Sequence, residues 1–454
     1  MAARLIDCLA TTDQLAKLFF DESVLESMLE FEVALARVEA RLGIIPQAAA
    51  EKITAAAKPE FFDAEAISRD SLRAGTPVIP LVKALRERVH ATDPAAANFV
   101  HWGATSQDAA DTALVLLLKK AHPIFESNLS RAEKSLHGLA EKHANTLMLG
   151  RTLMQPAPPI TFGLKAAGWL GAIHRSHRRL NDSFTDALIL QFGGASGTLA
   201  FLGEKGIAVG QALADEMGLA YPEAPWHTHR DRLAALMSAC GVLTGALGKT
   251  ARDISLLVQS EVGEVAEAAD SGRGGSSTMP HKHNPVGCVL ALAAANRVPA
   301  LVAAFLAAMI QEHERGVGGW QAEWPTVAAI IQATGLAVNS MADVVQGLSV
   351  DSDRMRSNIE ATNGAVFAEK AMLLLSPHLG REAAYRLLEK ANREAVASGR
   401  RLSHVLGEMP EVKDHLDFKA LHDLEVPELY LGVADELRKR LLASLDPDSR
   451  SKKE

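Results

Sequence analysis

Residues 274–285 read GGSSTMPHKHNP, and this short segment brings together hydroxyl, imidazole, ammonium and amide side chains without a carboxylate. The side chains able to donate hydrogen bonds or supply positive charge include Ser276, Ser277, Lys282 and Asn284. Pro285 is placed to be the first residue of a following helix. The amides of that helix N-terminus would join Lys282 and Asn284 in a cradle for an anion. An ordinary Gly/Ser surface loop explains the composition equally well.

Two more polar segments interrupt apolar stretches further upstream. HWGATSQDAADT, at 101–112, places donors ahead of a helical pattern: His101, Thr105, Ser106 and Gln107. GRTLMQPAPPITFG, at 150–163, places others before a proline-rich bend: Arg151, Thr152 and Gln155. For each segment alone, a helix cap or a simple loop is the more economical interpretation. All three segments lie beside long helical patterns, so they could meet at helix ends.

No metal or nucleotide cofactor is expected. HTHR at 227–230 contains two histidines, but no third ligand follows at a suitable spacing. Cys8, Cys240 and Cys288 show no paired spacing, which argues against a disulfide framework or a zinc site. The glycine-rich segment lacks the spacing of a nucleotide-binding loop.

The composition predicts a soluble cytoplasmic protein. The 454 residues carry a formal net charge of -8 and form no basic stripe, which argues against nucleic acid as a partner. The N-terminus lacks the charged-then-apolar pattern of a signal peptide. The most apolar stretch, near 286–310, is interrupted by Asn296, Arg297 and Pro299, so a membrane span is not expected.

Helical periodicity dominates the chain, and the prediction is an all-α fold. Long helices are expected at 108–145, 160–190, 231–267, 286–314 and 326–347. The stretch 231–267 has no proline and would extend roughly 50 Å as a helix. The apolar faces of these helices are wide and rich in Ala and Gly, which predicts packing in a bundle and across subunits. Asp351 is expected to cap a helix after a boundary near 347–355.

In combination and in this order, the three polar segments resemble those of the fumarase/aspartase superfamily. Its signature loop, Gly-Ser-Ser-x-Met-Pro-x-Lys-x-Asn, is matched by Gly275, Ser276, Ser277, Met279, Pro280, Lys282 and Asn284. Within the superfamily, the chain most resembles the 3-carboxy-cis,cis-muconate cycloisomerases. The stretches that carry this narrower likeness lie at 79–85, 191–203, 225–232 and 311–324. HWGATSQD is also similar to the first segment of adenylosuccinate lyases.

The resemblance implies a three-domain fold with a long central helical bundle, divided here at 1–100, 101–347 and 348–454. It also implies a homotetramer whose active sites each take segments from three subunits. Ser276 would carry the proton, and the loop would close over a polycarboxylate. The side chains implied to bind the substrate are His101, Thr105, Ser106, Arg151, Thr152, Gln155, Lys282, Asn284 and Arg315. The expected reaction forms a carboxymuconolactone in protocatechuate catabolism, without a cofactor or a metal.

Two positions depart from the pattern of fumarase and the related lyases. Where those enzymes carry a histidine and a glutamate that handle a proton, this chain has Leu153 and Val289. A carboxylate that adds to a double bond brings no proton to remove, so lactonisation needs no base on that side. The departure therefore favours a cycloisomerase. A 3-sulfomuconate cycloisomerase and an adenylosuccinate lyase-type lyase are the alternatives, and a structural protein without activity is a third.

Overall fold

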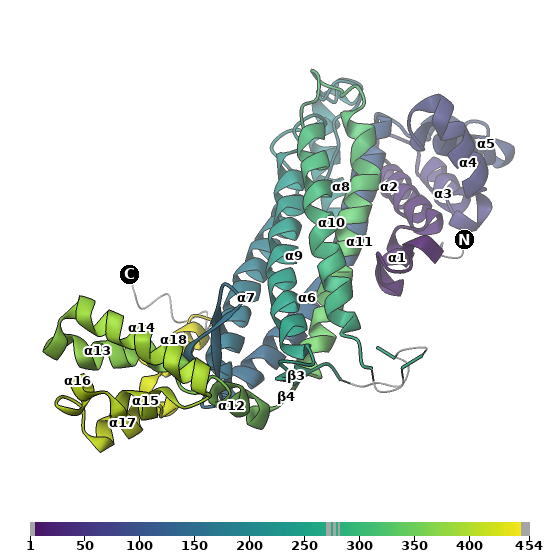
Figure 1. Cartoon of the computed structure of the whole chain (residues 1–454). Helices are drawn as coiled ribbons and strands as arrows, with labels where there is room; N and C mark the ends of the chain where they lie inside the picture. Colours follow the sequence, from purple (N-terminus) through teal and green to yellow (C-terminus); the bar gives the residue numbers. More distant parts are fainter. Residues whose placement is uncertain (1–4, 269–273, 276–277, 280–281, 446–454) are drawn as a thin grey trace. The chain divides into compact units, whose positions relative to one another are not determined.

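The computed structural model describes residues 5–268, 274–275, 278–279 and 282–445. These residues form α-helices connected by short loops, together with two small two-stranded sheets (Figure 1). Short 3-10 helices lie at Leu5–Asp7, Pro59–Phe61, Ala96–Phe99, Gly203–Lys205, Ala365–Phe367 and Pro427–Tyr430. The predicted all-α class is confirmed.

The chain divides by its contacts into two compact units, which are described separately. Unit 1 consists of Met1–Ser130, Arg175–Gly248 and Val289–Ser340. Unit 2 consists of Arg131–His174, Lys249–Cys288 and Met341–Glu454. This division does not test the three domains expected at 1–100, 101–347 and 348–454, which stay a prediction.

Five long helices correspond to the five predicted from periodicity. They are α6 (Ser106–Lys142), α7 (Phe162–Ala187), α9 (Asp231–Val258), α10 (Val286–Ala308) and α11 (Gly319–Gln346). The expected end of α9 at 267 is wrong. Gly263 adopts φ of 62°, and the amide of Glu264 turns back to the carbonyl oxygen of Leu257 at 2.9 Å. α9 ends at Val258, and the turn over 259–263 that follows it is closed by the amide of Gly263, which donates to the carbonyl oxygen of Gln259 at 2.7 Å.

Unit 1 begins with the helices α1 (Asp13–Leu18), α2 (Asp21–Arg41), α3 (Gln47–Ala56), α4 (Ala64–Ala74) and α5 (Val78–Thr92), and later adds α8 (Gly206–Met217). α2 contacts both α3 and α8, and its buried face is mostly apolar. Two carboxylic acids, Glu32 and Glu39, nevertheless lie on that face, with exposed fractions of 2% and 0%.

Unit 2 contains a β-hairpin where the sequence analysis expected a proline-rich bend. β1 (Leu147–Thr152) pairs antiparallel with β2 (Gln155–Thr161). Leu153 and Met154 form the turn with φ of 49° and 67°, as a two-residue hairpin turn requires. The prolines of β2 are tolerated because each strand of a two-stranded sheet has a free edge.

The remaining elements of unit 2 are mostly short helices. A second sheet pairs β3 (Val265–Ala266) with β4 (Ser349–Val350). The helices are α12 (Ser352–Glu360), α13 (Ala368–Leu379), α14 (Arg381–Ser398), α15 (Leu402–Glu408), α16 (Pro410–Lys413), α17 (Phe418–Leu424) and α18 (Ala434–Ala443). The predicted cap is confirmed, since the Asp351 carboxylate accepts from the amide of Arg354 at 2.8 Å.

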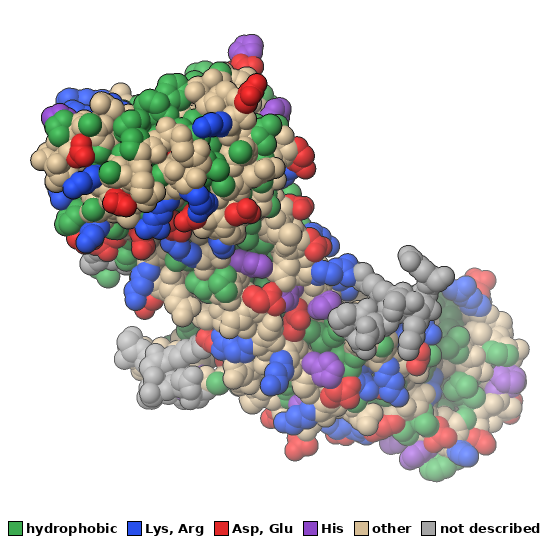
Figure 2. Space-filling model, turned by 180° about the vertical axis from the view of Figure 1, so that it is seen from behind, with side chains coloured by type: hydrophobic (Ala, Val, Ile, Leu, Met, Phe, Trp, Pro, Cys, Tyr) green, Lys and Arg blue, Asp and Glu red, His purple; other side chains and the backbone are tan. Residues whose placement is uncertain are grey.

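By length and composition alone, α9, α10 and α11 are apolar enough to cross a membrane. Most of the apolar window of α9 and of α11 is buried inside the protein, 61% and 72% respectively, but only 28% of the window of α10 is buried. Figure 2 shows acidic and basic side chains interspersed over the visible face, without a stripe of one sign.

Candidate active site

The first polar segment lies at the start of α6 in unit 1. The amide of Thr105 donates to the Asp108 carboxylate at 3.0 Å, and the amide of Asp108 donates to the Thr105 carbonyl oxygen at 3.0 Å. The competing interpretation of this segment as a helix cap is therefore correct for its backbone. The side chains of Thr105 and Ser106 are half-buried, whereas Gln107 is buried. Gln107 donates to the carbonyl oxygen of His227 at 2.7 Å.

Asp108 ties this segment to two distant parts of unit 1. Its carboxylate is fully buried and accepts from the amides of Gly193 and Gly194 at 3.0 and 2.9 Å. It also pairs with Nε2 of His227 at 2.7 Å. The HTHR stretch that resembled a metal site thus supplies a histidine to a buried carboxylate.

Arg315 reaches the same neighbourhood from the loop before α11. Its guanidinium donates to the carbonyl oxygen of Gly194 at 2.7 Å. Partial burial lowers the pKa of Arg315, and the negative charges of Asp108 and Asp111 oppose that shift. Unit 1 therefore brings Arg315 close to the first segment, as the sequence analysis expected of two groups that share a site.

A buried charge cluster of Arg230, Asp111 and Glu323 lies next to these residues. Arg230 is almost completely buried and donates to both oxygens of Asp111 at 2.8 and 3.0 Å and to Glu323 at 2.6 Å. Trp320 adds a hydrogen bond to Asp111 at 2.9 Å. Burial raises the pKa of Asp111, but Arg230 outweighs it and the net pKa is lowered. For Glu323 burial prevails over Arg230, so its pKa is raised.

His101 precedes this cap and contacts a carboxylate from α2. Its Nδ1 lies 2.6 Å from Oε1 of Glu32, and the side chains are 14% and 2% exposed. Burial lowers the pKa of His101, but the charge and hydrogen bond of Glu32 outweigh it, so the net pKa is raised.

The second segment belongs to the hairpin of unit 2. Arg151 pairs with Glu264 through two hydrogen bonds of 2.6 and 3.0 Å. Asn358 donates to the same carboxylate at 2.8 Å. Thr152 and Gln155 are exposed. Thr152 and Gln155 can therefore meet a ligand directly, whereas the guanidinium of Arg151 is held by a buried glutamate.

The third segment is described only in part, and Ser276 and Ser277 lie outside the described residues. Lys282 is exposed, and Asn284 is half-buried with its amide donating to the Gly274 carbonyl oxygen at 2.8 Å. At the start of α10, the amides of Gly287 and Cys288 donate to the carboxylate of Glu267 at 3.1 and 2.9 Å. Two amides of the expected anion cradle are thus occupied by the chain's own carboxylate.

The two apolar positions that replace the histidine and glutamate of related lyases are both accessible. Leu153 is 97% exposed at the hairpin turn, and Val289 on α10 is 54% exposed. Within a single chain, neither packs into a core.

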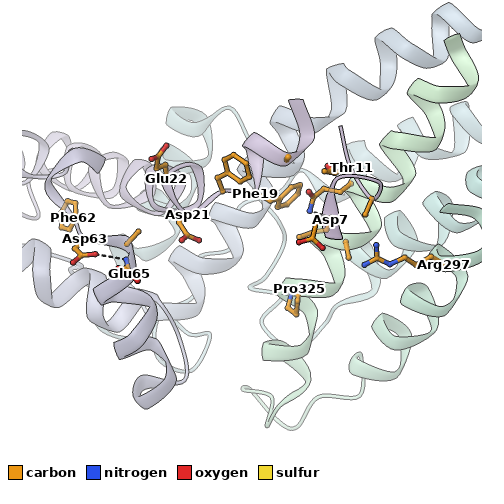
Figure 3. Close-up of a pocket in the computed structure, with 17 residues that line it drawn as sticks. Asp7, Thr11, Phe19, Asp21, Glu22, Phe62, Asp63, Glu65, Arg297 and Pro325 are labelled. Carbon is orange, nitrogen blue, oxygen red and sulfur yellow. Dashed lines mark hydrogen bonds between the residues drawn. The ribbon is translucent and has the colours of Figure 1, made fainter. Parts of the chain in front are cut away.

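A cavity of about 930 Å³ lies elsewhere in unit 1 (Figure 3). Its charged lining is mostly acidic: Asp7, Asp21, Glu22, Asp63 and Glu65 against Arg297. None of the predicted site residues lines it, and an acidic wall repels a polycarboxylate. Among the described residues, no group of three or more His, Cys, Asp or Glu side chains could hold a metal ion.

The amino-acid sequence matches two family models. The model described as Lyase matches residues 8–300, which is more than half of the chain. The chain belongs to this lyase family. A second model, described as Adenylosuccinate lyase C-terminus, matches residues 364–441 of this lyase.

Relatives resemble this lyase over nearly their whole length. The 3-carboxy-cis,cis-muconate cycloisomerase of Bradyrhizobium diazoefficiens is 47% identical, over 94% of this chain and 95% of its own. That of Pseudomonas aeruginosa is 47% identical, over 97% of this chain and 96% of its own. The crystal structure of the 3-carboxy-cis,cis-muconate lactonizing enzyme from Pseudomonas putida matches with a TM-score of 0.91 and 44% identity, over 98% of this chain and 99% of that chain. The resemblance inferred from the three segments is confirmed.

The sequence analysis missed the acids that organise unit 1. Asp108 and Asp111 begin a helix whose following residues are largely buried and apolar, and Glu32 lies on a helix face that is otherwise apolar. A charged residue within an apolar stripe is buried only when it is paired. The position of these acids among apolar residues therefore indicates that they are paired, but it does not identify the residues with which they pair.

Proposed function

We propose that this lyase is a cycloisomerase that converts 3-carboxy-cis,cis-muconate into a carboxymuconolactone, in the cytoplasm and without a cofactor. The observation that carries the proposal is the pair of relatives with this name at 47% identity over nearly the whole chain. The matched serine loop, with Ser276, Lys282 and Asn284 in place, supports an active enzyme over a structural protein.

In this reaction a substrate carboxylate oxygen forms a bond to one alkene carbon, and the other alkene carbon gains a proton. Charge develops beside a second carboxylate before that proton arrives. Lys282 and Asn284 stabilise this charge. Ser276 delivers the proton and regains one from solvent, and in the reverse direction it acts as the base.

The three substrate carboxylates are bound by donors from all three segments. Within unit 1, the donors are His101, Arg315, which is hydrogen-bonded to Gly194, and the hydroxyls of the half-buried residues Thr105 and Ser106. Unit 2 supplies the exposed side chains of Thr152, Gln155 and Lys282. Arg151 contributes to substrate binding indirectly, by its position in the hairpin, because its guanidinium is paired with Glu264.

Leu153 and Val289 lie beside the attacking carboxylate in this proposal. A carboxylate nucleophile carries no proton at neutral pH, so it needs no base beside it. Apolar side chains can therefore occupy that place. Elimination of an amine or addition of water would need a proton carrier at that place.

We also propose that the enzyme is a homotetramer of three-domain subunits, whose sites combine segments from three subunits. The exposed face of α10 supports this assembly because most of its side chains are apolar and many are small, including Val289, Ala293, Ala300, Ala303, Ala304 and Ala307, although Asn296 and Arg297 are exposed there as well. Such a surface is typical of helices that pack closely against other helices.

The test is loss of ultraviolet absorbance of the conjugated diene, measured in a chelating buffer because the proposal requires no metal. 3-Carboxy-cis,cis-muconate should be consumed with formation of one lactone. 3-Sulfomuconate, followed in the same way, and adenylosuccinate, followed by release of fumarate, should react at least tenfold more slowly. No turnover of the carboxymuconate, or faster turnover of either alternative, would refute the proposed function.

A further inference from the structure

The contact between His101 and Glu32 joins two elements that are distant in sequence. Glu32 lies on the buried face of α2, and His101 lies in the loop before α6. The 2.6 Å separation between Nδ1 and Oε1 is that of a charge-assisted hydrogen bond.

No other hydrogen-bond partner for the Glu32 carboxylate is found among the described residues. Its Oε2 is buried without one, as are both carboxylate oxygens of Glu39 further along α2. An ionised carboxylate in such surroundings is costly unless a positive charge compensates it. The ring of His101 is the group that can supply this charge.

The charges that face His101 come from three helices. Glu32 on α2 and Asp108 on α6 favour the imidazolium, and Arg86 on α5 opposes it. The backbone of His101 also has φ of 60°, a left-handed conformation that is strained for a non-glycine residue. The side-chain contact with Glu32 helps to hold the ring in place despite this strain.

We propose that Glu32 is a positioning residue that keeps His101 as an imidazolium, with Nδ1–H donating to Glu32 and Nε2–H left to donate to a substrate carboxylate. The ring thereby adds a fixed positive charge to the first segment. This assignment rests on the proposed function for the identity of the substrate. The ionic state of the ring is independent of it.

This pair differs in role from the histidine and glutamate that related lyases carry where this chain has Leu153 and Val289. A proton carrier must change its protonation state during turnover. Here the carboxylate holds the proton on one nitrogen, and the reaction needs only the charge. For a chain of net charge -8, a local cation assists binding of a tricarboxylate.

The experiment compares Glu32→Gln with Glu39→Gln in the full-length enzyme. Glu32→Gln keeps an acceptor for Nδ1–H but removes the charge. Burial and the nearby Glu32 raise the pKa of Glu39 to about 9, so Glu39→Gln replaces a neutral acid by a neutral amide on the same helix face. The matched control therefore changes the same atoms without changing the charge.

Two readouts are measured for both variants and the parent: the pKa of His101 by NMR of labelled histidine, and the pH dependence of kcat/KM. The spectrum of His101→Asn identifies the His101 signal. In the parent, His101 should titrate above the ordinary histidine value. In Glu32→Gln its pKa and the alkaline limb of kcat/KM should both fall by about one unit or more, as expected for loss of a close opposite charge. In Glu39→Gln both should stay within about 0.3 units of the parent, since no charge is lost.

An unchanged His101 pKa in Glu32→Gln would overturn the proposal, and so would an alkaline limb that stays in place. If Glu32→Gln fails to fold, a parent His101 pKa at or below the ordinary histidine value overturns it instead. A shifted His101 titration in protein that does not turn over the diene would uphold the ionic pair and refute the proposed function.

Discussion

The first polar segment, in unit 1, and the second and third, in unit 2, differ in how completely one chain fixes them. In unit 1, Asp108 is fully buried, and its carboxylate accepts from two backbone amides and from His227. Arg315 is bonded to one of the same glycines. In unit 2, Thr152, Gln155 and Lys282 are exposed.

This difference indicates which part of the proposed site depends on assembly of the subunits. Buried hydrogen bonds to charged groups order side chains before a substrate arrives. Exposed side chains on a hairpin turn and a loop lose conformational entropy when they bind a substrate, unless contact with another subunit has already ordered them. We therefore expect unit 1 to supply rigid binding groups and unit 2 to supply groups that become ordered by assembly.

The largest effect on turnover is expected in the third segment. Ser276→Ala should lower kcat by at least about 10²-fold, since a positioned acid or base contributes that much. Ser277→Ala should lower it less, and the thermal midpoint of both variants should stay near that of the parent. Steady-state kinetics on both variants gives the comparison. Equal losses of kcat in the two variants, or a larger loss in Ser277→Ala, would show that Ser276 is not the proton carrier.

The largest effect on stability is expected in unit 1. Arg230→Met leaves Asp111 and Glu323 buried without their cation and should cost about 3–5 kcal/mol of unfolding free energy. Arg151→Met is the matched variant in unit 2, where Glu264 keeps the hydrogen bond of Asn358 and the arginine is partly exposed. It should cost less. Urea unfolding of both variants measures the two losses of unfolding free energy. Equal losses would contradict the difference between the two units.

The sequence predicted the helices better than the contacts between them. Periodicity predicted α6, α7, α9, α10 and α11, but it did not predict the end of α9 at Val258, because no proline or glycine follows directly. The family resemblance implied that the first segment and Arg315 bind the same substrate. Asp111, Arg230 and Glu323 are far apart in sequence, and no spacing rule links them. Their pairing is a property of the folded bundle, as is the pairing of Glu32 with His101.

Adding back a proton carrier tests two exposed positions, Leu153 in unit 2 and Val289 in unit 1. Leu153→His with Val289→Glu should not raise turnover of 3-carboxy-cis,cis-muconate, because a carboxylate nucleophile gains nothing from a base. Val289→Glu alone should weaken subunit association more than folding of the chain, because Val289 is 54% exposed on α10. Light scattering over a concentration series, with Leu153→His as control, checks this. A double variant several-fold faster than the parent would contradict the carboxylate chemistry.

A pH-dependent effect on stability is expected from the buried acid of α2. The pKa of Glu39 is raised from 4.5 to about 9 in the folded protein, so the folded state holds this proton more tightly than the unfolded state. Its contribution to stability is complete below pH 4.5 and is lost as the pH rises towards 9. Glu39→Gln should therefore lose less thermal stability than the parent between pH 5 and about pH 8. Parallel pH dependences of the thermal midpoint would show that Glu39 is ionised in the fold.

The central claim, that segments of different subunits complete one site, is tested most directly by subunit complementation. His101→Asn impairs the first segment and Ser276→Ala the third, so each homotetramer alone should have little activity. When the two chains are expressed together, some sites should combine an intact first segment from one chain with an intact third segment from the other. We predict that the mixed tetramers regain at least about tenfold more activity than either variant alone, within the range that one catalytic proton carrier contributes. Mixed tetramers, verified by differential tags, that are no more active than the two variants separately would contradict the account.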